Sequence, residues 1–109
     1  KIVVAHFGHP WQPDTIALIR KHPNVYTDIS AQFYRPWQYY NALTLCMEYA
    51  QLHKVFFGTD FPVTTSQETI DTLRSVNDIV EGTNLPRIPE KEIEGIINRD
   101  ALALLGIEM

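Results

Sequence analysis

One histidine and one aspartate each follow a short apolar run of the kind that forms a buried strand. His6 comes directly after residues 2–5, and Asp60 comes shortly after residues 55–58. In parallel α/β folds the groups that carry out chemistry lie at the carboxyl ends of strands. Because neutral imidazole and carboxylate both bind Zn²⁺ and Mn²⁺, the pair predicts a shared metal ion or proton transfer to a bound water.

Each member of this pair also has a purely structural interpretation. A histidine at the end of a strand can satisfy a local hydrogen bond and do nothing else. Asp60 stands just before Phe61 and Pro62, so its carboxylate could cap the turn there. The joint placement favours the chemical interpretation, because the carboxyl ends of parallel strands meet at one edge of a sheet.

Three further side chains are candidates for substrate contacts. His9 follows His6 by three residues and could reach a substrate, or pack as a loop histidine near Trp11. Trp11 could form a pocket wall or lie buried under the rim of the fold. Arg35 lies in an aromatic loop, residues 33–37, that Tyr39 and Tyr40 extend. Its guanidinium could bind a carboxylate, although the same composition is typical of a protein interface.

Two other positions are weighed in the same way. Asp28 and Ser30 end a strand candidate, residues 25–30, and could support the site residues or cap a turn. Cys46 stands beside apolar neighbours inside a predicted helix, which indicates a small core residue rather than a nucleophile.

The elements that position these residues alternate along the chain. Strands are predicted at residues 2–5, 25–30 and 54–58, and helices at about 13–22, 37–52, 66–80, 89–97 and 99–105. We expect Ser66 to cap the third helix, Pro89 to take the first position of the fourth, and Gly106 to end the last. Alternation of strands and helices predicts a parallel sheet with right-handed crossovers.

Composition limits the classes of function. A chain of 109 residues suffices for one modest core, so residues 1–109 are expected to belong to a single domain. The net charge of −4, with scattered basic residues, argues against a nucleic-acid partner, and no apolar run is long enough to span a membrane. The single cysteine excludes an intrachain disulfide, and we expect a cytoplasmic protein. Three strands alone make a poorly covered parallel sheet, so we expect a piece of something larger.

Four segments, in order, resemble the amidohydrolase-related family of metal-dependent (β/α)₈ barrels. Residues 3–11 resemble its H-x-G-x-P-W segment, residues 24–30 its N-V-Y-x-D-x-S strand, and residues 55–62 its V-L-F-G-[ST]-D-[YF]-P strand. Residues 98–106 resemble the closing N-A-x-x-L-L-G helix, although Arg99 and Asp100 interrupt that pattern. The resemblance implies an α/β fold in which the chain is the C-terminal part, about strands six to eight, of a TIM barrel.

The resemblance also implies a chemistry. The parent protein would be a metal-dependent hydrolase of amides or lactones, or a non-oxidative decarboxylase (a lyase), acting on a small and in some cases carboxylated molecule. His6 would match the sixth-strand histidine at the metal centre, and Asp60 the eighth-strand aspartate that meets the metal and acts as general base. The metal would be Zn²⁺, or alternatively Mn²⁺. The family's first-strand H-x-H pair and fifth-strand histidine are absent from the chain, so we expect it to be inactive alone.

An alternative from a different class remains open. The parent could be a barrel with a degenerate metal site that serves binding or assembly, including assembly into a homo-oligomer. The aromatic loop and an open barrel edge would then be contact surfaces, and His6 and Asp60 would be structural.

Overall fold

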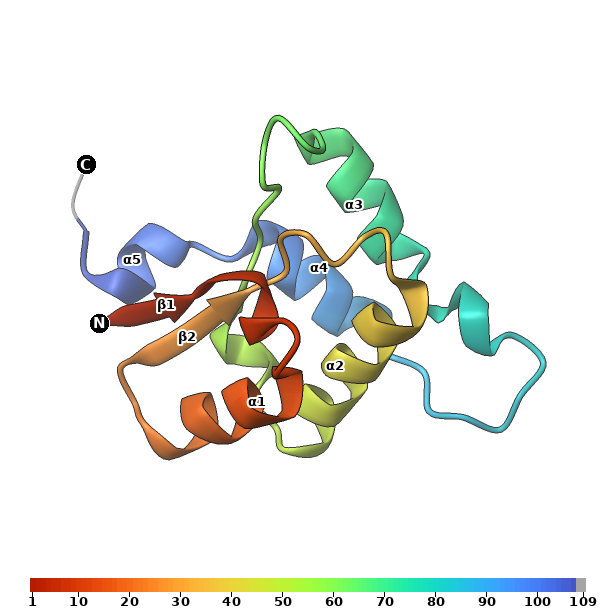
Figure 1. Ribbon diagram of the computed structural model, residues 1–109, viewed down its shortest axis with the longest axis horizontal. Coiled ribbons are helices and arrows are strands. Elements are labelled where there is room, and N and C mark those ends of the chain that lie inside the picture. The colour runs from red at the N-terminus through yellow and green to blue at the C-terminus, as the bar shows by residue number, and fades with distance from the viewer. Residues whose placement is uncertain (108–109) are drawn as a thin grey trace.

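Three short strands form one parallel sheet in the computed structural model, which describes residues 1–107 (Figure 1). The strands are β1 (Ile2–Val4), β2 (Val25–Asp28) and β3 (Val55–Phe56), with β2 in the middle. Val4 pairs with Thr27, which in turn pairs with Val55. The predicted parallel α/β arrangement is therefore confirmed, although each strand is shorter than the apolar run that predicted it.

Helices follow each strand, as predicted. They are α1 (Gln12–Lys21), α2 (Pro36–Glu48), α3 (Ser66–Arg74), α4 (Glu90–Asn98) and α5 (Ala101–Leu105), together with the 3₁₀ turns η1 (Ala5–Gly8), η2 (Leu52–Lys54) and η3 (Val76–Val80). Helices α1 and α2 pack against each other, and α4 packs against α3, η2 and β3 (Figure 1). No helix in this described part of the chain is both long and apolar enough to cross a bilayer.

Two predicted helix starts are wrong by one residue, and one predicted helix is broken. Thr65, not Ser66, caps α3, because its extended backbone lets its hydroxyl accept from the Glu68 N–H at 3.2 Å. Pro89 precedes α4 with an extended ψ of 141° instead of opening it. The third predicted helix stops at Ser75, whose N–H bonds to the carbonyls of Asp71 and Thr72 and so tightens the last turn.

The last predicted terminus is confirmed. Gly106 follows α5 with φ 75°, and its N–H bonds to the Ala103 carbonyl while Ile107 N–H bonds to Leu102. This left-handed end satisfies carbonyls that the helix would leave without partners.

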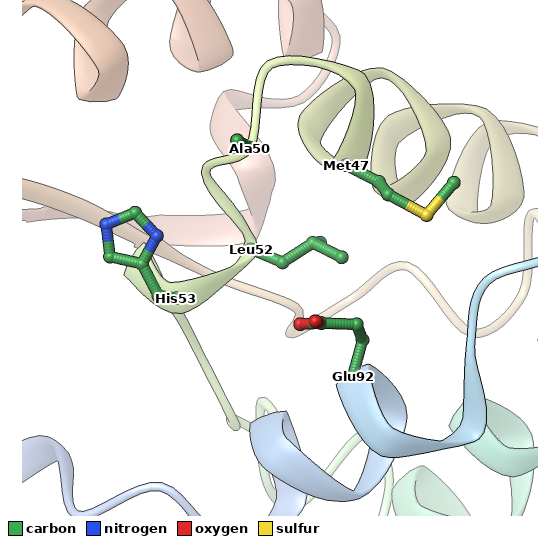
Figure 2. Close-up of a pocket in the computed structure, with 5 residues that line it drawn as sticks. All are labelled: Met47, Ala50, Leu52, His53 and Glu92. Carbon is green, nitrogen blue, oxygen red and sulfur yellow. The ribbon is translucent and has the colours of Figure 1, made fainter.

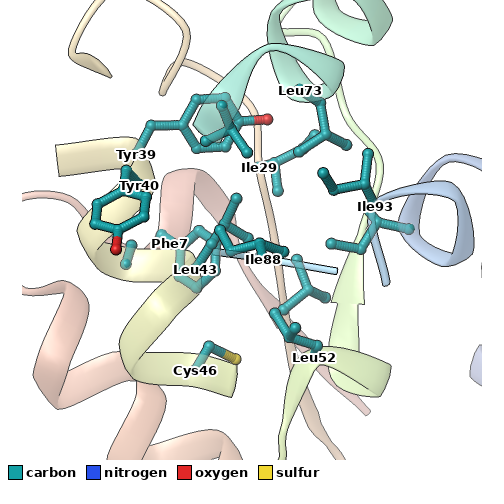
Figure 3. Packing of buried hydrophobic residues seen from close by; sticks show 14 of the residues in the cluster. Phe7, Ile29, Tyr39, Tyr40, Leu43, Cys46, Leu52, Leu73, Ile88 and Ile93 are labelled. Atoms are coloured by element: carbon teal, nitrogen blue, oxygen red, sulfur yellow. The ribbon is translucent and has the colours of Figure 1, made fainter. Parts of the chain in front are cut away.

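One hydrophobic cluster joins the sheet to the helices (Figure 3). Its buried members come from every layer and include Phe7, Ile16, Ile29, Leu43, Val55, Leu73, Ile88 and Ile96. Tyr39 and Tyr40 also belong to it, so these two residues are core and not part of an exposed aromatic loop. The predicted loop ends earlier than expected because Pro36 opens α2, and the helical repeat then turns Tyr39 and Tyr40 inward.

The edge strand β1 leaves apolar side chains exposed among the described residues. Ile2 is 60% exposed and Val3 is 38% exposed, while α5 lies next to the start of β1 through a Lys1 Nζ bond to the Leu104 carbonyl at 2.8 Å. An open sheet edge of this kind is the one expected for three strands without further cover.

Cys46 is a buried core residue, as predicted, and its burial has a measurable consequence. Desolvation raises the pKa of its thiol from 9.0 to about 12, with Arg99 opposing the shift. We expect a thiol reagent to modify Cys46 only as fast as the fold opens, since the thiolate is the reactive form. Rapid labelling of the native chain, relative to chain unfolded in urea, would contradict this.

The same shift predicts a loss of stability at alkaline pH. Because the folded pKa lies above the unfolded value, stability is full below about pH 9 and falls as pH rises towards 12. Urea unfolding at about pH 7 and about pH 10 should show a drop that is smaller in Cys46→Ala, which has no thiol to titrate. Equal drops in the two proteins would rule out Cys46 as a cause.

Candidate active site

Backbone strain is concentrated at the carboxyl ends of the three strands. His6 and Phe7 follow β1 with φ of 59° and 54°, Ala31 follows β2 with 59°, and Asp60 follows β3 with 58°. Among the described non-glycine residues, only Ala50 adopts this left-handed conformation elsewhere. For a residue with a side chain, this left-handed conformation costs about 1–2 kcal/mol relative to the right-handed one. Such strain persists where surrounding structure enforces it, and it is often found at functional sites.

Phe7 explains how the turn after β1 is held. Its ring is fully buried in the core next to α2, as Figure 3 shows, so it anchors η1. The burial of Phe7 therefore holds the neighbouring His6 in its left-handed backbone conformation after β1. Its own side chain is half-buried. The His9–Pro10 peptide in the same turn, and Phe61–Pro62 after β3, are cis.

His6 is held by two residues at the end of β2, its ring by Ser30 and its backbone N–H by Asp28. Its Nδ1 lies 2.6 Å from Ser30 Oγ, and the Ser30 hydroxyl donates in turn to Asp28 Oδ1. The same Asp28 oxygen accepts the N–H groups of Ser30 at 3.0 Å and His6 at 3.1 Å. Of the two interpretations left open for Asp28 and Ser30, the geometry gives both: they close a turn, and they hold the candidate histidine.

A second chain of hydrogen bonds reaches His9. Gln12 Nε2 lies 3.0 Å from His9 Nδ1 and donates to Gln32 Oε1 at 3.4 Å. Gln32 Nε2 donates to the carbonyl of His6 at 3.0 Å. Gln32 is completely buried and Gln12 is 8% exposed. Sequence reasoning missed both glutamines, because nothing in a single sequence separates a buried glutamine from an exposed one.

Asp60 lies exposed beyond the end of β3, and its carboxylate has no hydrogen-bond partner among residues 1–107. The turn is closed instead by its backbone carbonyl, which accepts from Val63 N–H at 2.9 Å, and by the Thr59 hydroxyl, which accepts from Phe61 N–H at 3.2 Å. The carboxylate is therefore not a turn cap. It remains available to a ligand.

The segment after β3 packs against Asp28 and Ser30 at the end of β2. A side-chain carbon added at Gly58 would lie 3.5 Å from both Asp28 Cγ and Ser30 Cβ. The segment that leads to Asp60 thus runs against the two residues that hold His6. His6 and Asp60 leave the outer strands of one parallel sheet at the same edge, with β2 between them and a strand spacing of about 4.8 Å.

The donor chemistry at this edge suits a divalent metal, but the donors are few. An imidazole nitrogen and a carboxylate are ordinary zinc ligands, and catalytic zinc sites usually take three protein ligands. Within residues 1–107, no group of three or more His, Cys, Asp or Glu side chains is placed to hold an ion. His6 and Asp60 therefore fit part of a metal site.

Large exposed side chains lie at the same edge. Trp11 is 65% exposed, so of its two possible placements burial under the rim is wrong; its carbonyl accepts from the Thr15 N–H of α1 at 3.0 Å. Phe61, beside Asp60, is 76% exposed, and Tyr34 and Trp37 after β2 are also exposed. Arg35 stacks on the ring of Tyr34 at 4.1 Å, so its guanidinium stays close to this edge.

One hollow in the surface lies elsewhere. It has a volume of about 280 Å³ and is lined by Met47, Ala50, Leu52, His53 and Glu92 (Figure 2). Leu52 and His53 belong to η2, which precedes β3, so this hollow is at the amino end of that strand. Its location separates it from the strained turns and from both candidate ligands.

Comparison with known proteins gives a match at the level of a family. The model of the family described as amidohydrolase matches residues 1–107. No curated protein and no solved structure matches the chain.

Proposed function

Because the chain belongs to the amidohydrolase family, we propose that it supplies part of the active site of a metal-dependent hydrolase. Its three strands would be about the sixth to eighth of a (β/α)₈ barrel, whose reactions take place at the carboxyl ends of the strands. The bond cleaved would be an amide or a lactone ester. Loss of carbon dioxide from a carboxylated substrate is the alternative reaction within the same site.

One observation supports the proposal most strongly. The chain holds left-handed, strained residues after each of its three strands, and it places His6 and Asp60 among them. The ring of His6 is held by Ser30, whose hydroxyl donates to Asp28, whereas the carboxylate of Asp60 is exposed. A tethered histidine and a carboxylate with no partner among residues 1–107 follow strands of the same sheet, and both are donors that suit a divalent ion.

Each residue has a separate part in the proposed chemistry. His6 offers a ring nitrogen and Asp60 a carboxylate oxygen to a divalent ion, Zn²⁺ or Mn²⁺, which supplies Lewis-acid chemistry when it is bound. The exposed Asp60 carboxylate is free to accept a proton from a water in the site. Arg35 would bind a substrate carboxylate, and Trp11 would contact the substrate. The remaining ligands would come from outside residues 1–107.

The test is metal binding by the full-length protein and two variants. His6→Asn and Asp60→Asn are suitable, because asparagine tolerates the left-handed backbone at both positions. Both should weaken Zn²⁺ binding by more than the roughly 10–100-fold that loss of an outer hydrogen-bond partner causes. The matched controls His22→Asn and Asp78→Asn replace exposed residues and should bind as the wild type does.

A wild-type protein that stays folded but binds no metal would overturn the proposal, as would normal binding by both variants. Either result would favour a barrel used for binding or assembly. If metal binding is confirmed, product analysis with lactones, amides and aromatic carboxylic acids separates hydrolysis from decarboxylation, because only the latter releases carbon dioxide.

A further inference from the structure

We propose that partly buried hydrogen bonds fix His6 and His9 in opposite tautomers, so that His6 presents a nitrogen lone pair and His9 presents an N–H donor. The two rings leave the same turn, in which His9 N–H bonds to the His6 carbonyl at 2.8 Å. Four positioning residues, Asp28, Ser30, Gln12 and Gln32, determine the two proton positions.

The proton position on His6 follows from the Asp28 carboxylate, which ends the chain of hydrogen bonds through Ser30. Asp28 Oδ1 already accepts the backbone N–H groups of His6 and Ser30, and the single hydroxyl hydrogen of Ser30 is donated to the same oxygen. Ser30 Oγ can then only accept from His6 Nδ1, 2.6 Å away. Nδ1 therefore carries the hydrogen of the neutral ring, and Nε2 carries the lone pair.

The proton position on His9 follows from two backbone carbonyls. Gln32 Nε2 lies 3.0 Å from the His6 carbonyl oxygen and 3.4 Å from that of Ser30, so this end of the amide must be the donor. Gln32 Oε1 is then the acceptor, and Gln12 Nε2 must donate to it. The second hydrogen on Gln12 Nε2 points to His9 Nδ1 at 3.0 Å. That nitrogen is the acceptor, which leaves the hydrogen on Nε2.

Burial keeps these assignments in place. Gln32 is fully buried, and Gln12 and Ser30 are nearly so. Little water can reach them to replace a lost partner, so a switch of either tautomer would leave a polar atom without a partner. Each imidazole is therefore held in one proton arrangement before any ligand arrives.

The two tautomers suit different tasks. A lone pair on His6 Nε2 can bind a metal or take a proton, whereas the His9 Nε2–H can donate to a substrate oxygen. This division of labour rests on the proposed function. The tautomers themselves do not, because they follow from contacts inside the chain.

The test is nitrogen-15 NMR of the histidine side chains in metal-free protein, at a pH where the rings are neutral. His6 should show a protonated Nδ1 and an unprotonated Nε2, and His9 the reverse. The exposed His22 and His53 serve as internal references, since free histidine exchanges between forms and favours Nε2–H. His6 is the sharper case, because its expected tautomer is the one that free histidine disfavours.

Two variants give reciprocal controls. Ser30→Ala removes the acceptor of His6 and should turn its Nδ1–H form from nearly the whole population into a minority, with His9 unchanged. Gln12→Glu replaces a donor by an acceptor and should move the His9 hydrogen to Nδ1, with His6 unchanged. If either variant fails to fold, the wild-type spectrum still decides the assignment of His6.

A wild-type His6 that carries its hydrogen on Nε2 would overturn the inference, as would a Ser30→Ala spectrum identical to the wild type. Zn²⁺ titration separates this from failure of the proposed function. Both tautomers as expected without metal binding would contradict the proposed function alone. Metal binding with His6 protonated on Nε2 before metal is added would contradict the inference alone.

Discussion

Gly8→Ala is expected to destabilise the fold by about 2–5 kcal/mol. Gly8 has φ 69°, which an alanine adopts only with strain, and the added carbon would lie 1.8 Å from Thr15 Oγ1 and 3.0 Å from Thr15 Cβ. Thr15 cannot easily withdraw, because it is buried in α1 and its hydroxyl bonds to the Trp11 carbonyl at 3.2 Å. Urea unfolding of the two proteins measures the difference in free energy.

A matched glycine separates the strain from the clash. Gly82 has φ 75° and nothing within 4 Å of an added carbon, so Gly82→Ala should lose only about 1–2 kcal/mol. Adding Thr15→Ala to Gly8→Ala should recover the steric part in a double-mutant cycle. Equal losses for the two glycine variants would show that the turn after β1 relaxes away from α1.

Asp28→Ala is expected to destabilise the fold by about 3 kcal/mol, because it removes one oxygen that accepts three hydrogen bonds. The N–H groups of His6 and Ser30 and the Ser30 hydroxyl would all lose their partner. The affected groups join the ends of β1 and β2, so amide hydrogen exchange at His6 and Ser30 should accelerate more than exchange in α4. Urea unfolding and exchange rates together measure the effect.

Two controls define the origin of that loss. Asp28→Asn keeps an oxygen acceptor and should lose about half as much, since bonds to a charged acceptor are roughly twice as strong as neutral ones. Asp14→Ala removes an exposed carboxylate and should stay within about 0.5 kcal/mol of the wild type. An Asp28→Ala protein as stable as the Asp14 variant would mean that water replaces the carboxylate.

Much of the architecture could be predicted because its signals are local. The β-branched runs at residues 2–5 and 25–30 and the apolar run at 54–58 place the strands, and their alternation with helical repeats predicts the parallel sheet that the structure has. The ends of the helices were harder to predict. Thr65 and Ser66 are both good cap residues, and only the extended backbone of Thr65 decides between them.

The candidate site also has features that the sequence predicts and features that it does not. The placement of His6 and Asp60 after strands is visible in the sequence, since it depends only on where an apolar run stops. The exposure of Trp11 and the burial of Tyr39 and Tyr40 could not be predicted from the sequence, because exposure depends on which element packs on each side chain. Nothing in the sequence indicated that Gln12 and Gln32 are buried beside the two histidines.

Local signals in the sequence were enough for the kinds of element, their order, the family resemblance and the two candidate residues that follow the outer strands. The tertiary structure was needed to show that Ser30 and Asp28 hold His6, that two buried glutamines connect His6 to His9, and that the Asp60 carboxylate has no partner within residues 1–107. The physical reason is the range of the forces involved. Strand and helix signals arise between near neighbours in the chain, whereas the bonds from Asp28, Ser30 and Gln32 to the His6 and Gln12 segments join residues twenty or more positions apart, which meet only after the sheet has formed.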